Sequence, residues 1–295
     1  MIKVQVTLTP NEAKRLIAKA VSQMPVVRSA FEKGRILLKG GTTVSALAEE
    51  LVGTKMPIAG RITARGTKAA ASGIHTFHRI LLDKGRTRSL DSDSEIEGAA
   101  VQMGKEDVLI TGANAIDIER RTAIMVGRPL GGSAGILPKM IARGIPTIIT
   151  VGWEKLIPCP VEEAMSQAGN ETIDFAMGMT VGLIPLSGTV VTETDAVNLL
   201  AGVKATVIGA GGIQGGEGST TFVMAGTPSQ MREAWNLVQS VKGAEASGTP
   251  ETLEECEPGC PFCTSHEDVA GQRIMTHRGC IYFRPNLIDK ALPRP

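Results

Sequence analysis

The feature that most constrains this chain is a short apolar segment that runs through a glycine turn into an amphipathic segment. Residues 35–39 read Arg-Ile-Leu-Leu-Lys, and Gly40-Gly41-Thr42-Thr43 follow them directly. A helix with a threonine N-cap is expected next, with its apolar face formed by Val44, Leu47, Ala48 and Leu51. Strand, glycine turn and helix in this order form the building block of a parallel α/β sheet.

The same pattern recurs further along the chain. Residues 107–114 and 146–152 are buried-strand runs that end in turns, and residues 57–65 and 78–90 predict further strands. Between them, Gly131-Gly-Ser-Ala-Gly135 leads into a predicted helix over 136–143. We therefore predict an α/β fold with an open, mostly parallel sheet and helices on both faces.

A long helix is expected before the first of these units, over residues 9–33. Thr9 suits the N-cap, Pro10 suits the first helical position, and Glu12 stands where a capping box requires it. Gly34 then provides a stop.

The pattern of apolar segments changes after residue 160. A smaller α+β unit is predicted for residues 181–245, after an α/β core over 1–180, and a linker with a cysteine-rich tail for 246–295. A helix from Thr227 is expected to bury one stripe, consisting of Met231, Ala234, Trp235 and Val238. The glycine-rich stretch 209–218 lacks the spacing of a dinucleotide fingerprint and precedes a strand, so it predicts a hairpin loop or a flap over a site.

Four of the five cysteines lie in the C-terminal tail. Cys256, Cys260 and Cys263 have the spacing Cys-x3-Cys-x2-Cys, and the intervening prolines and glycine favour tight turns that bring three thiolates together. Convergent sulfur ligands select zinc or an iron–sulfur cluster, and Cys280 is the expected fourth ligand. A redox pair or ordinary thiols are the alternatives. Cys159 stands apart and is expected to be a plain thiol.

Zinc and iron–sulfur sites differ in the cysteine spacing that is typical of them. Zinc sites more often use two paired-cysteine knuckles, so the pattern leans towards iron–sulfur. Cys-x3-Cys-x2-Cys is similar in spacing to the cluster motif of radical S-adenosylmethionine enzymes, but here it follows the α/β core and a fourth cysteine is available. His266 and His277 are possible substitute ligands.

The glycine turns predict where an anion binds. Backbone N–H groups at a helix N-terminus have no partner within the helix, and the helix dipole favours negative charge. Gly40, Gly41, Thr42 and Thr43 form one such turn, and Gly131, Gly132 and Ser133 form another; a mere tight turn is the alternative for each. Arginines precede the second turn in sequence and are candidate anion ligands, namely Arg120, Arg121 and Arg128. A second basic patch consists of His75, His78, Arg79, Arg86 and Arg88. It is either an anion-binding site or a solvent-exposed charged face.

These motifs carry a resemblance. Residues 40–51 resemble the phosphate-binding turn and helix of the ribose-5-phosphate isomerase and CoA-transferase-like superfamily, which includes sugar-sensing repressor domains and initiation-factor-2B-type proteins. Residues 107–117 are similar to that superfamily's strand ending in a Gly-Ala-Asp turn, and residues 143–147 to the turn before its next strand. The resemblance implies that Gly112, Ala113 and Asn114 line the pocket for a sugar phosphate or acyl compound.

One departure from that pattern bears on catalysis. Asn114 stands where the isomerase-like members usually have an aspartate, and an amide cannot take up a proton as a carboxylate does. Asp117 is the nearby carboxylate, either a catalytic group or a helix cap.

Composition limits the partners. The net charge is +1 and aromatics are 3%, which argues against nucleic acid, and the longest apolar runs are far shorter than a membrane span of ~20 residues. No secretory signal is visible at Met1, so the expected location is the cytoplasm. The sequence leaves homo-oligomerisation open.

Two functions follow from the motifs and the resemblance. One is an isomerase- or transferase-like enzyme acting on a small anionic molecule, and the other is a ligand- or redox-sensing protein without turnover.

Overall fold

The computed structural model describes residues 1–58, 60–64, 66–69, 78–127, 133–253, 272–276 and 279–283. Its centre is a six-stranded sheet in the order β13 (Thr189–Val191), β10 (Thr147–Thr150), β7 (Val108–Gly112), β2 (Arg35–Lys39), β5 (Arg79–Asp83) and β6 (Arg86–Ser89). The first four strands run parallel to one another, and β5 and β6 are antiparallel to their neighbours. The fold is therefore α/β with a mixed sheet.

The antiparallel edge of this sheet is a local hairpin. β5 and β6 are joined by Lys84 and Gly85, which both have positive φ, at 50° and 75°. Positive φ at both central residues matches the right-handed twist of the two strands, which makes a two-residue connection possible. A parallel connection would have needed a crossover of a dozen or more residues.

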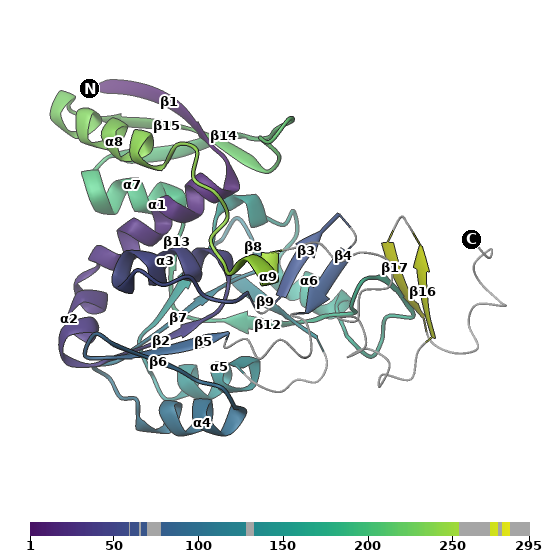
Figure 1. Cartoon of the computed structure of the whole chain (residues 1–295). Helices are drawn as coiled ribbons and strands as arrows, with labels where there is room; N and C mark the ends of the chain where they lie inside the picture. The colour runs from purple at the N-terminus through teal and green to yellow at the C-terminus, as the bar shows by residue number, and fades with distance from the viewer. Residues whose placement is uncertain are drawn as a thin grey trace.

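Helices cover both faces of the central sheet (Figure 1). α1 (Pro10–Gln23), α2 (Pro25–Lys33) and α3 (Thr42–Val52) lie on one face, and α4 (Asp93–Gln102) and α5 (Ser133–Ala142) lie on the other. The strand residues alternate accordingly. Ile36 and Leu38 of β2 belong to the core under α1 and α3, whereas Leu37 belongs to the core over α4 and α5. Strands buried on both faces explain the continuous apolar runs in the sequence.

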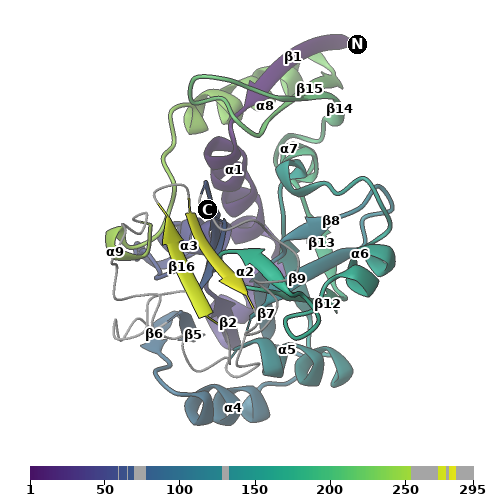
Figure 2. The same ribbon diagram turned by 90° about the vertical axis from the view of Figure 1, so that its right-hand side faces the viewer.

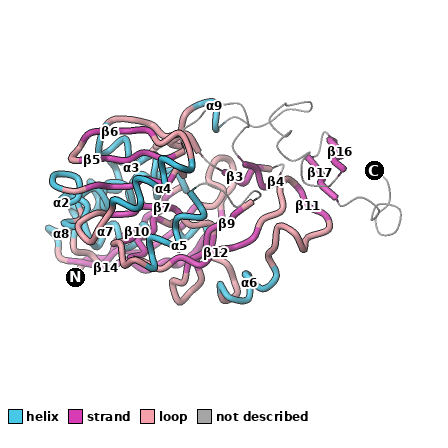
Figure 3. Tube along the Cα trace, turned by 90° about the horizontal axis from the view of Figure 1, so that it is seen from below, coloured by secondary structure: helices cyan, strands magenta, loops and turns pink. Residues whose placement is uncertain are grey.

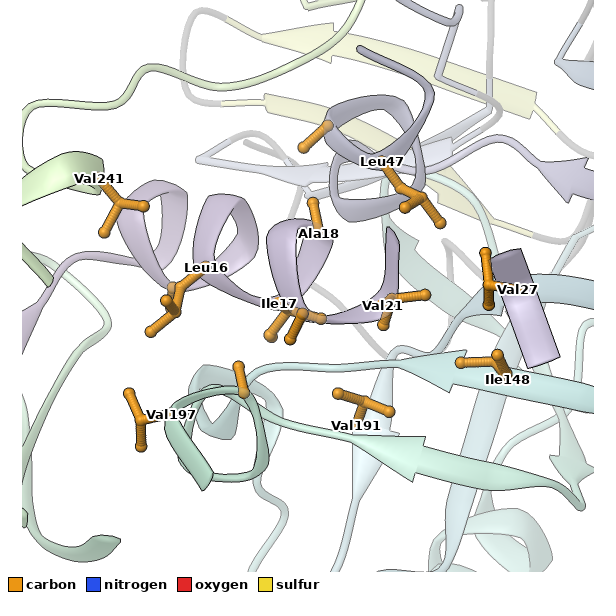
Figure 4. Close-up of a cluster of buried hydrophobic side chains, with 14 of the residues drawn as sticks. Leu16, Ile17, Ala18, Val21, Val27, Leu47, Ile148, Val191, Val197 and Val241 are labelled. Atoms are coloured by element: carbon orange, nitrogen blue, oxygen red, sulfur yellow. The ribbon is translucent and has the colours of Figure 1, made fainter. Parts of the chain in front are cut away.

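Helix α1 lies at the centre of the larger core (Figure 4). Its Ala18 faces Leu47 of α3, while Ile17 and Val21 point towards Val191 at the end of β13. α7 (Glu193–Ala201) closes the opposite side of α1, and the whole cluster is almost fully buried. α1 therefore ties the central sheet to the elements above it.

The predicted start of α1 is confirmed, but the predicted single helix over 9–33 is two helices. Thr9 accepts a hydrogen bond from the Glu12 N–H, and the Glu12 side chain accepts one from the Thr9 N–H, which completes the capping box. Met24 leaves the helical region with ψ 133° because Pro25 follows it, and α2 begins at that proline.

A second sheet stands above the helical layer and joins distant parts of the chain (Figures 1 and 2). β1 (Ile2–Leu8) pairs with β15 (Ser219–Gly226), which pairs with β14 (Lys204–Gly211), all antiparallel. α8 (Pro228–Val241) packs against this sheet, and residues 212–218 of the glycine-rich stretch form the loop between β14 and β15. Trp235 of α8 is 44% exposed, so it does not belong to the buried stripe with which the sequence grouped it.

The sheets do not follow the predicted division of the chain at residue 180. β1, from the predicted core, lies in the small sheet, and β13, from the predicted small unit, is an edge of the central sheet. The two units are interleaved because strand pairing depends on spatial neighbours rather than on sequence order.

The predicted linker after residue 245 is docked on the core as far as residue 253. Ser247 and Thr252 are 4% and 2% exposed. The Ser247 hydroxyl hydrogen-bonds Ser45 and Glu49 of α3, and the Thr252 hydroxyl accepts from the Ile58 N–H. The polar side chains of this segment hydrogen-bond to residues of the core, so the segment is part of the folded structure. Its polar composition had predicted a linker.

Smaller elements complete the structure at one end of the molecule (Figure 3). β8 (Ala115–Ile116), β9 (Thr122–Val126) and β12 (Gly182–Leu186) form one sheet, and β3 (Gly60–Thr63) pairs with β4 (Gly66–Ala69). β11 (Phe175–Met177) pairs with β17 (Gly279–Phe283), which pairs with β16 (Gln272–Thr276). The remaining helical pieces are η1 (Trp153–Lys155), α6 (Val161–Gln167) and α9 (Pro250–Leu253). Within the residues that the structure describes, no helix is both long and apolar enough to cross a membrane.

Candidate functional site

The carboxyl ends of the four parallel strands meet at one edge of the central sheet. Gly40 follows β2, Gly112 ends β7, Gly152 follows β10 and Thr192 follows β13. Open α/β sheets bind their ligands at this edge. Among the residues that the structure describes, the four groups whose pKa values depart furthest from ordinary all lie here, namely Lys39, His78, Lys155 and Glu193. Such displaced pKa values are typical of functional sites.

The glycine turn after β2 is built by close packing of backbone. The Gly40 N–H donates to the His78 carbonyl at 2.6 Å, and a Cβ at Gly40 would come within 2.7 Å of the Pro57 carbonyl oxygen. Gly41 is the N-cap of α3 and has no side-chain capping bond, so the expected threonine cap is wrong. Open space surrounds the position of a Gly41 Cβ. The first-turn N–H groups of Thr43 and Val44 therefore lack the side-chain acceptor that a capping threonine would supply.

Two cations stand opposite each other beside this turn. Lys39 of β2 pairs in register with Arg79 of β5, so their side chains share one face of the sheet. Burial, and secondarily the Arg79 charge, lowers the pKa of Lys39 to about 8. Burial also lowers the pKa of Arg79, which Asp93 partly offsets at 3.6 Å. Like charges directly opposite on a sheet are destabilising, so an anion bound between them would stabilise this end of β2.

His78 adds to the same cluster. Burial, followed by the Arg79 charge, lowers its pKa to about 4, and its Nδ1 is buried without a hydrogen-bond partner among the described residues. The imidazole is therefore neutral at pH 7. A neutral histidine beside two cations does not add to the like-charge repulsion, and a hydrogen bond with the Pro57 backbone holds its ring.

The second glycine turn is only partly described. Arg128, Gly131 and Gly132 lie outside the described residues, and Ser133 is the first residue of α5. Only four residues separate its end at Ala142 from the start of β10 at Thr147, so α5 ends near the amino edge and begins towards the carboxyl edge. Strand alternation puts Lys39 and Arg79 on the α5 face, because Leu37 and Leu81 belong to that core. The structure thus brings the start of α5 and the cationic pair to one face.

The residues at the end of β7 and in the turn after it have structural partners. Gly112 pairs with Thr150 of β10, Ala113 is 2% exposed, and the Asn114 side-chain oxygen accepts from the Met125 N–H at 3.0 Å. The Ala113 carbonyl accepts a hydrogen bond from the Lys155 ammonium at 2.8 Å. Burial lowers the pKa of Lys155 to about 8. The turn predicted to line the pocket therefore lies beside a lysine that the sequence did not single out.

A buried carboxylate lies on the same edge, at the first position of α7. Glu193 is 0% exposed and accepts from the Trp153 N–H and from the Thr220 hydroxyl at 2.7 Å. Burial raises the pKa of Glu193 to about 7, and the charge of nearby Glu154 contributes in the same direction. Glu154 itself lies 3.6 Å from Lys14.

Asp117, the predicted catalytic residue, is fully engaged by its own surroundings. Oδ1 accepts from the Glu119 and Arg121 N–H groups, and Oδ2 accepts from the Arg121 side chain and the Val161 N–H. Burial alone would raise the pKa of Asp117, but the hydrogen bonds from Val161 and Arg121 hold it below its ordinary value. Four hydrogen bonds on two oxygens are typical of a structural carboxylate that fixes the β8–β9 hairpin.

The predicted metal ligands fall largely outside the described chain. Cys256, Cys260 and Cys263 lie outside the described residues, and only the backbone of Cys280 is placed, opposite Met275 in the β16–β17 pair. Among described residues, Cys159 is a free thiol and no group of three His, Cys, Asp or Glu side chains is arranged to hold a metal.

Comparison with protein-family models, with curated proteins and with solved structures finds no match. The resemblance to the ribose-5-phosphate isomerase and CoA-transferase-like superfamily therefore stays a prediction.

Sequence reasoning missed Lys39, Lys155 and Glu193. Lys39 had a usable signal, since it is the last residue of a strand that feeds a glycine turn. Lys155 and Glu193 had none, because burial of a lysine or a glutamate is decided by packing between segments about 40 residues apart.

Proposed function

We propose that this protein binds a small anionic metabolite, such as a sugar phosphate or an acyl compound, at the carboxyl edge of its central sheet. The observation that carries the proposal is the facing pair Lys39 and Arg79 beside the glycine turn at Gly40 and Gly41. Phosphate or carboxylate oxygens would neutralise the two cations and accept from the first-turn N–H groups of α3 or α5. Arg79 suits this role because its planar guanidinium has several donors in a fixed geometry.

Ribose 5-phosphate, ribose and inorganic phosphate are the probes that test this site. We expect ribose 5-phosphate to raise the melting temperature of the full chain, since a ligand that binds only the folded state stabilises it. Lys39→Met should weaken that binding roughly tenfold in calorimetric titration, because it removes one charge-assisted contact.

Lys105→Met is the matched control, since Lys105 is exposed and precedes β7 at the amino edge of the same sheet. It should leave the affinity unchanged. Ribose 5-phosphate without any effect on the melting temperature, or equal weakening by both variants, contradicts the proposal.

For an isomerase- or transferase-like reaction, we propose Lys155 as the acid–base group in place of Asp117. Lys155 lies against the Gly112–Asn114 turn and its pKa is lowered to about 8, within the range where a lysine exchanges protons near neutral pH. Asp117 has no free acceptor position, and Asn114 cannot carry a proton.

The alternative is a ligand-sensing protein without turnover. The hydrogen bonds of Asp117 and Asn114 favour a sensor. These are the two positions at which the superfamily resemblance implies an acid–base group, and both side chains are held in structural hydrogen bonds. Interconversion of ribose 5-phosphate and ribulose 5-phosphate, followed in the wild type and in Lys155→Met, separates the two: binding without product in either protein supports the sensor.

We further propose that Cys256, Cys260, Cys263 and Cys280 hold an iron–sulfur cluster or zinc. The support is the Cys-x3-Cys-x2-Cys spacing with its turn-forming residues. Elemental analysis and a visible spectrum of anaerobically purified protein should show metal that Cys260→Ser loses and Cys159→Ser keeps. A brown sample indicates the cluster and a colourless zinc-loaded one indicates zinc; unchanged metal in Cys260→Ser contradicts this ligand set.

A further inference from the structure

A cavity of about 580 Å³ lies at the other end of the same sheet edge, between the two sheets. Its walls are η1 after β10, the first turns of α7 after β13, strand β14 and the hairpin turn at Arg120. β14 and α7 lie next to each other above the central sheet (Figure 1). Three strand spacings, ~14 Å, separate β13 from β2, so the cavity at the β13 end of the sheet is apart from the cationic pair at Lys39. A volume of this size accommodates a small organic molecule.

One wall of the cavity is apolar. Leu156, which is 46% exposed, and Val207 and Ala205 of β14 contribute aliphatic surface, and Trp153 contributes an aromatic ring. β14 carries a register shift between Val207 and Gly209 at this wall. Bulges of this kind change the direction in which a strand presents its side chains, and they are frequent beside binding sites.

The other wall carries a fixed cation. Arg120 has φ 65°, which a non-glycine residue adopts rarely, and its guanidinium carbon lies 5.9 Å from the centre of the Trp153 ring. Its Nη2 donates to the Val190 carbonyl and to Asp195. An arginine has five N–H donors, and those on Nε and Nη1 have no hydrogen-bond partner within the part of the chain that the structure describes.

The charges around the cavity favour an anion. Arg120, Lys204 and Asp195 are its charged residues, which gives a net charge of +1. Asp195 is already occupied, since it accepts from the Thr192 N–H and hydroxyl at the start of α7 as well as from Arg120. Lys204 is exposed at the rim and forms no ion pair with a described residue.

We propose that this cavity binds a small carboxylate with a short apolar body. Arg120 and Lys204 receive the carboxylate, and Leu156 and Val207 pack against the body. The site is separate from the proposed anion site at Lys39. It takes a different ligand, because aliphatic side chains rather than a glycine turn line one of its walls.

Tryptophan fluorescence reads the site directly, because the chain has two tryptophans and Trp235 lies on the exposed face of α8. In a Trp235→Phe background, hexanoate should change the Trp153 emission in a saturable way. Hexanamide lacks the charge and acetate lacks the body, so each should bind at least roughly tenfold more weakly.

Two variants test the assignment of the cations. Arg120→Gln should weaken hexanoate binding roughly tenfold, and Lys204→Glu, which changes an exposed residue and leaves the fold intact, roughly fivefold. Lys3→Glu is the matched control, since Lys3 is exposed on β1, the opposite edge strand of the same small sheet. Absence of a saturable response to hexanoate, an equal response to hexanamide, or equal weakening by Lys3→Glu overturns the proposal.

Discussion

Two buried carboxylates on the same side of the central sheet behave in opposite ways. Asp117, in the β8–β9 hairpin, is 2% exposed and its pKa is lowered, whereas Glu193, at the start of α7, is 0% exposed and its pKa is raised to about 7. Burial acts on both in the same direction. What differs is the number and kind of partners.

Asp117 is surrounded by donors, and Glu193 is not. Three backbone N–H groups and the Arg121 guanidinium satisfy both oxygens of Asp117. Glu193 has the Trp153 N–H and the Thr220 hydroxyl, with the carboxylate of Glu154 nearby. The difference shows that burial by itself does not identify a functional carboxylate: one with many donors and a guanidinium maintains structure, and one with fewer, neutral donors has a pKa near neutrality.

The largest effect is expected when the satisfied carboxylate is removed. Asp117→Ala leaves the N–H groups of Glu119, Arg121 and Val161 without their acceptor, so we expect the free energy of unfolding to fall by about 3 to 4 kcal/mol. Urea denaturation followed by circular dichroism measures it. Glu119→Ala, which removes an exposed carboxylate from the same hairpin, is the control and should change little. Equal losses in the two variants would mean that the hydrogen bonds of Asp117 do not stabilise the hairpin.

The next effect is the pH dependence of stability, which distinguishes Glu193 from Asp117. The pKa of Glu193 rises from 4.5 to about 7 on folding, so its contribution to stability is complete below pH 4.5 and is lost as the pH rises to about 7. Glu154 is the charged group that acts on it, and Glu154 in turn lies 3.6 Å from Lys14 and acts on Lys155. Glu193→Gln cannot ionise, so it should gain stability relative to the wild type across this window, by about 2 to 3 kcal/mol in total.

Asp117 should show the reverse slope in a different window. Its lowered pKa stabilises the protein above the unfolded value of 3.8, and that contribution is lost as the pH falls further. Denaturation curves at a series of pH values distinguish the two carboxylates. A stability difference between the wild type and Glu193→Gln that stays constant from pH 4.5 to 7 would falsify the raised pKa.

The smallest effect concerns Arg121, the side-chain partner of Asp117 among the described residues. Arg121 is 38% exposed, and exposed ion pairs contribute little because water and salt screen them. Arg121→Gln should therefore reduce stability by only a small fraction of the Asp117→Ala loss, since the three backbone donors remain. A loss in urea denaturation as large as that of Asp117→Ala would show that the guanidinium, rather than the backbone, holds this carboxylate.

Much of the local structure was predictable. The capping boxes at Thr9 and Thr227, the strand 35–39 before its glycine turn, and the hairpin loop over the glycine-rich stretch all follow from contacts between residues close in sequence. The candidate anion turn at Gly40 was predictable for the same reason. Thr42 as a cap was not, because the helix begins at Thr42 itself and its N-cap is Gly41.

The sequence by itself determined that the chain forms strands and helices in α/β order, because apolar periodicity and capping are local properties of neighbouring residues. Only the tertiary structure decided that β1 pairs with β15, that β13 is an edge of the central sheet, and that Lys39 faces Arg79. It also decided that Asp117 accepts from three backbone N–H groups and a guanidinium, while Glu193 accepts from one backbone N–H and a hydroxyl. The physical reason is the same in each case: strand pairing and the pKa of a buried group depend on which distant segments surround them.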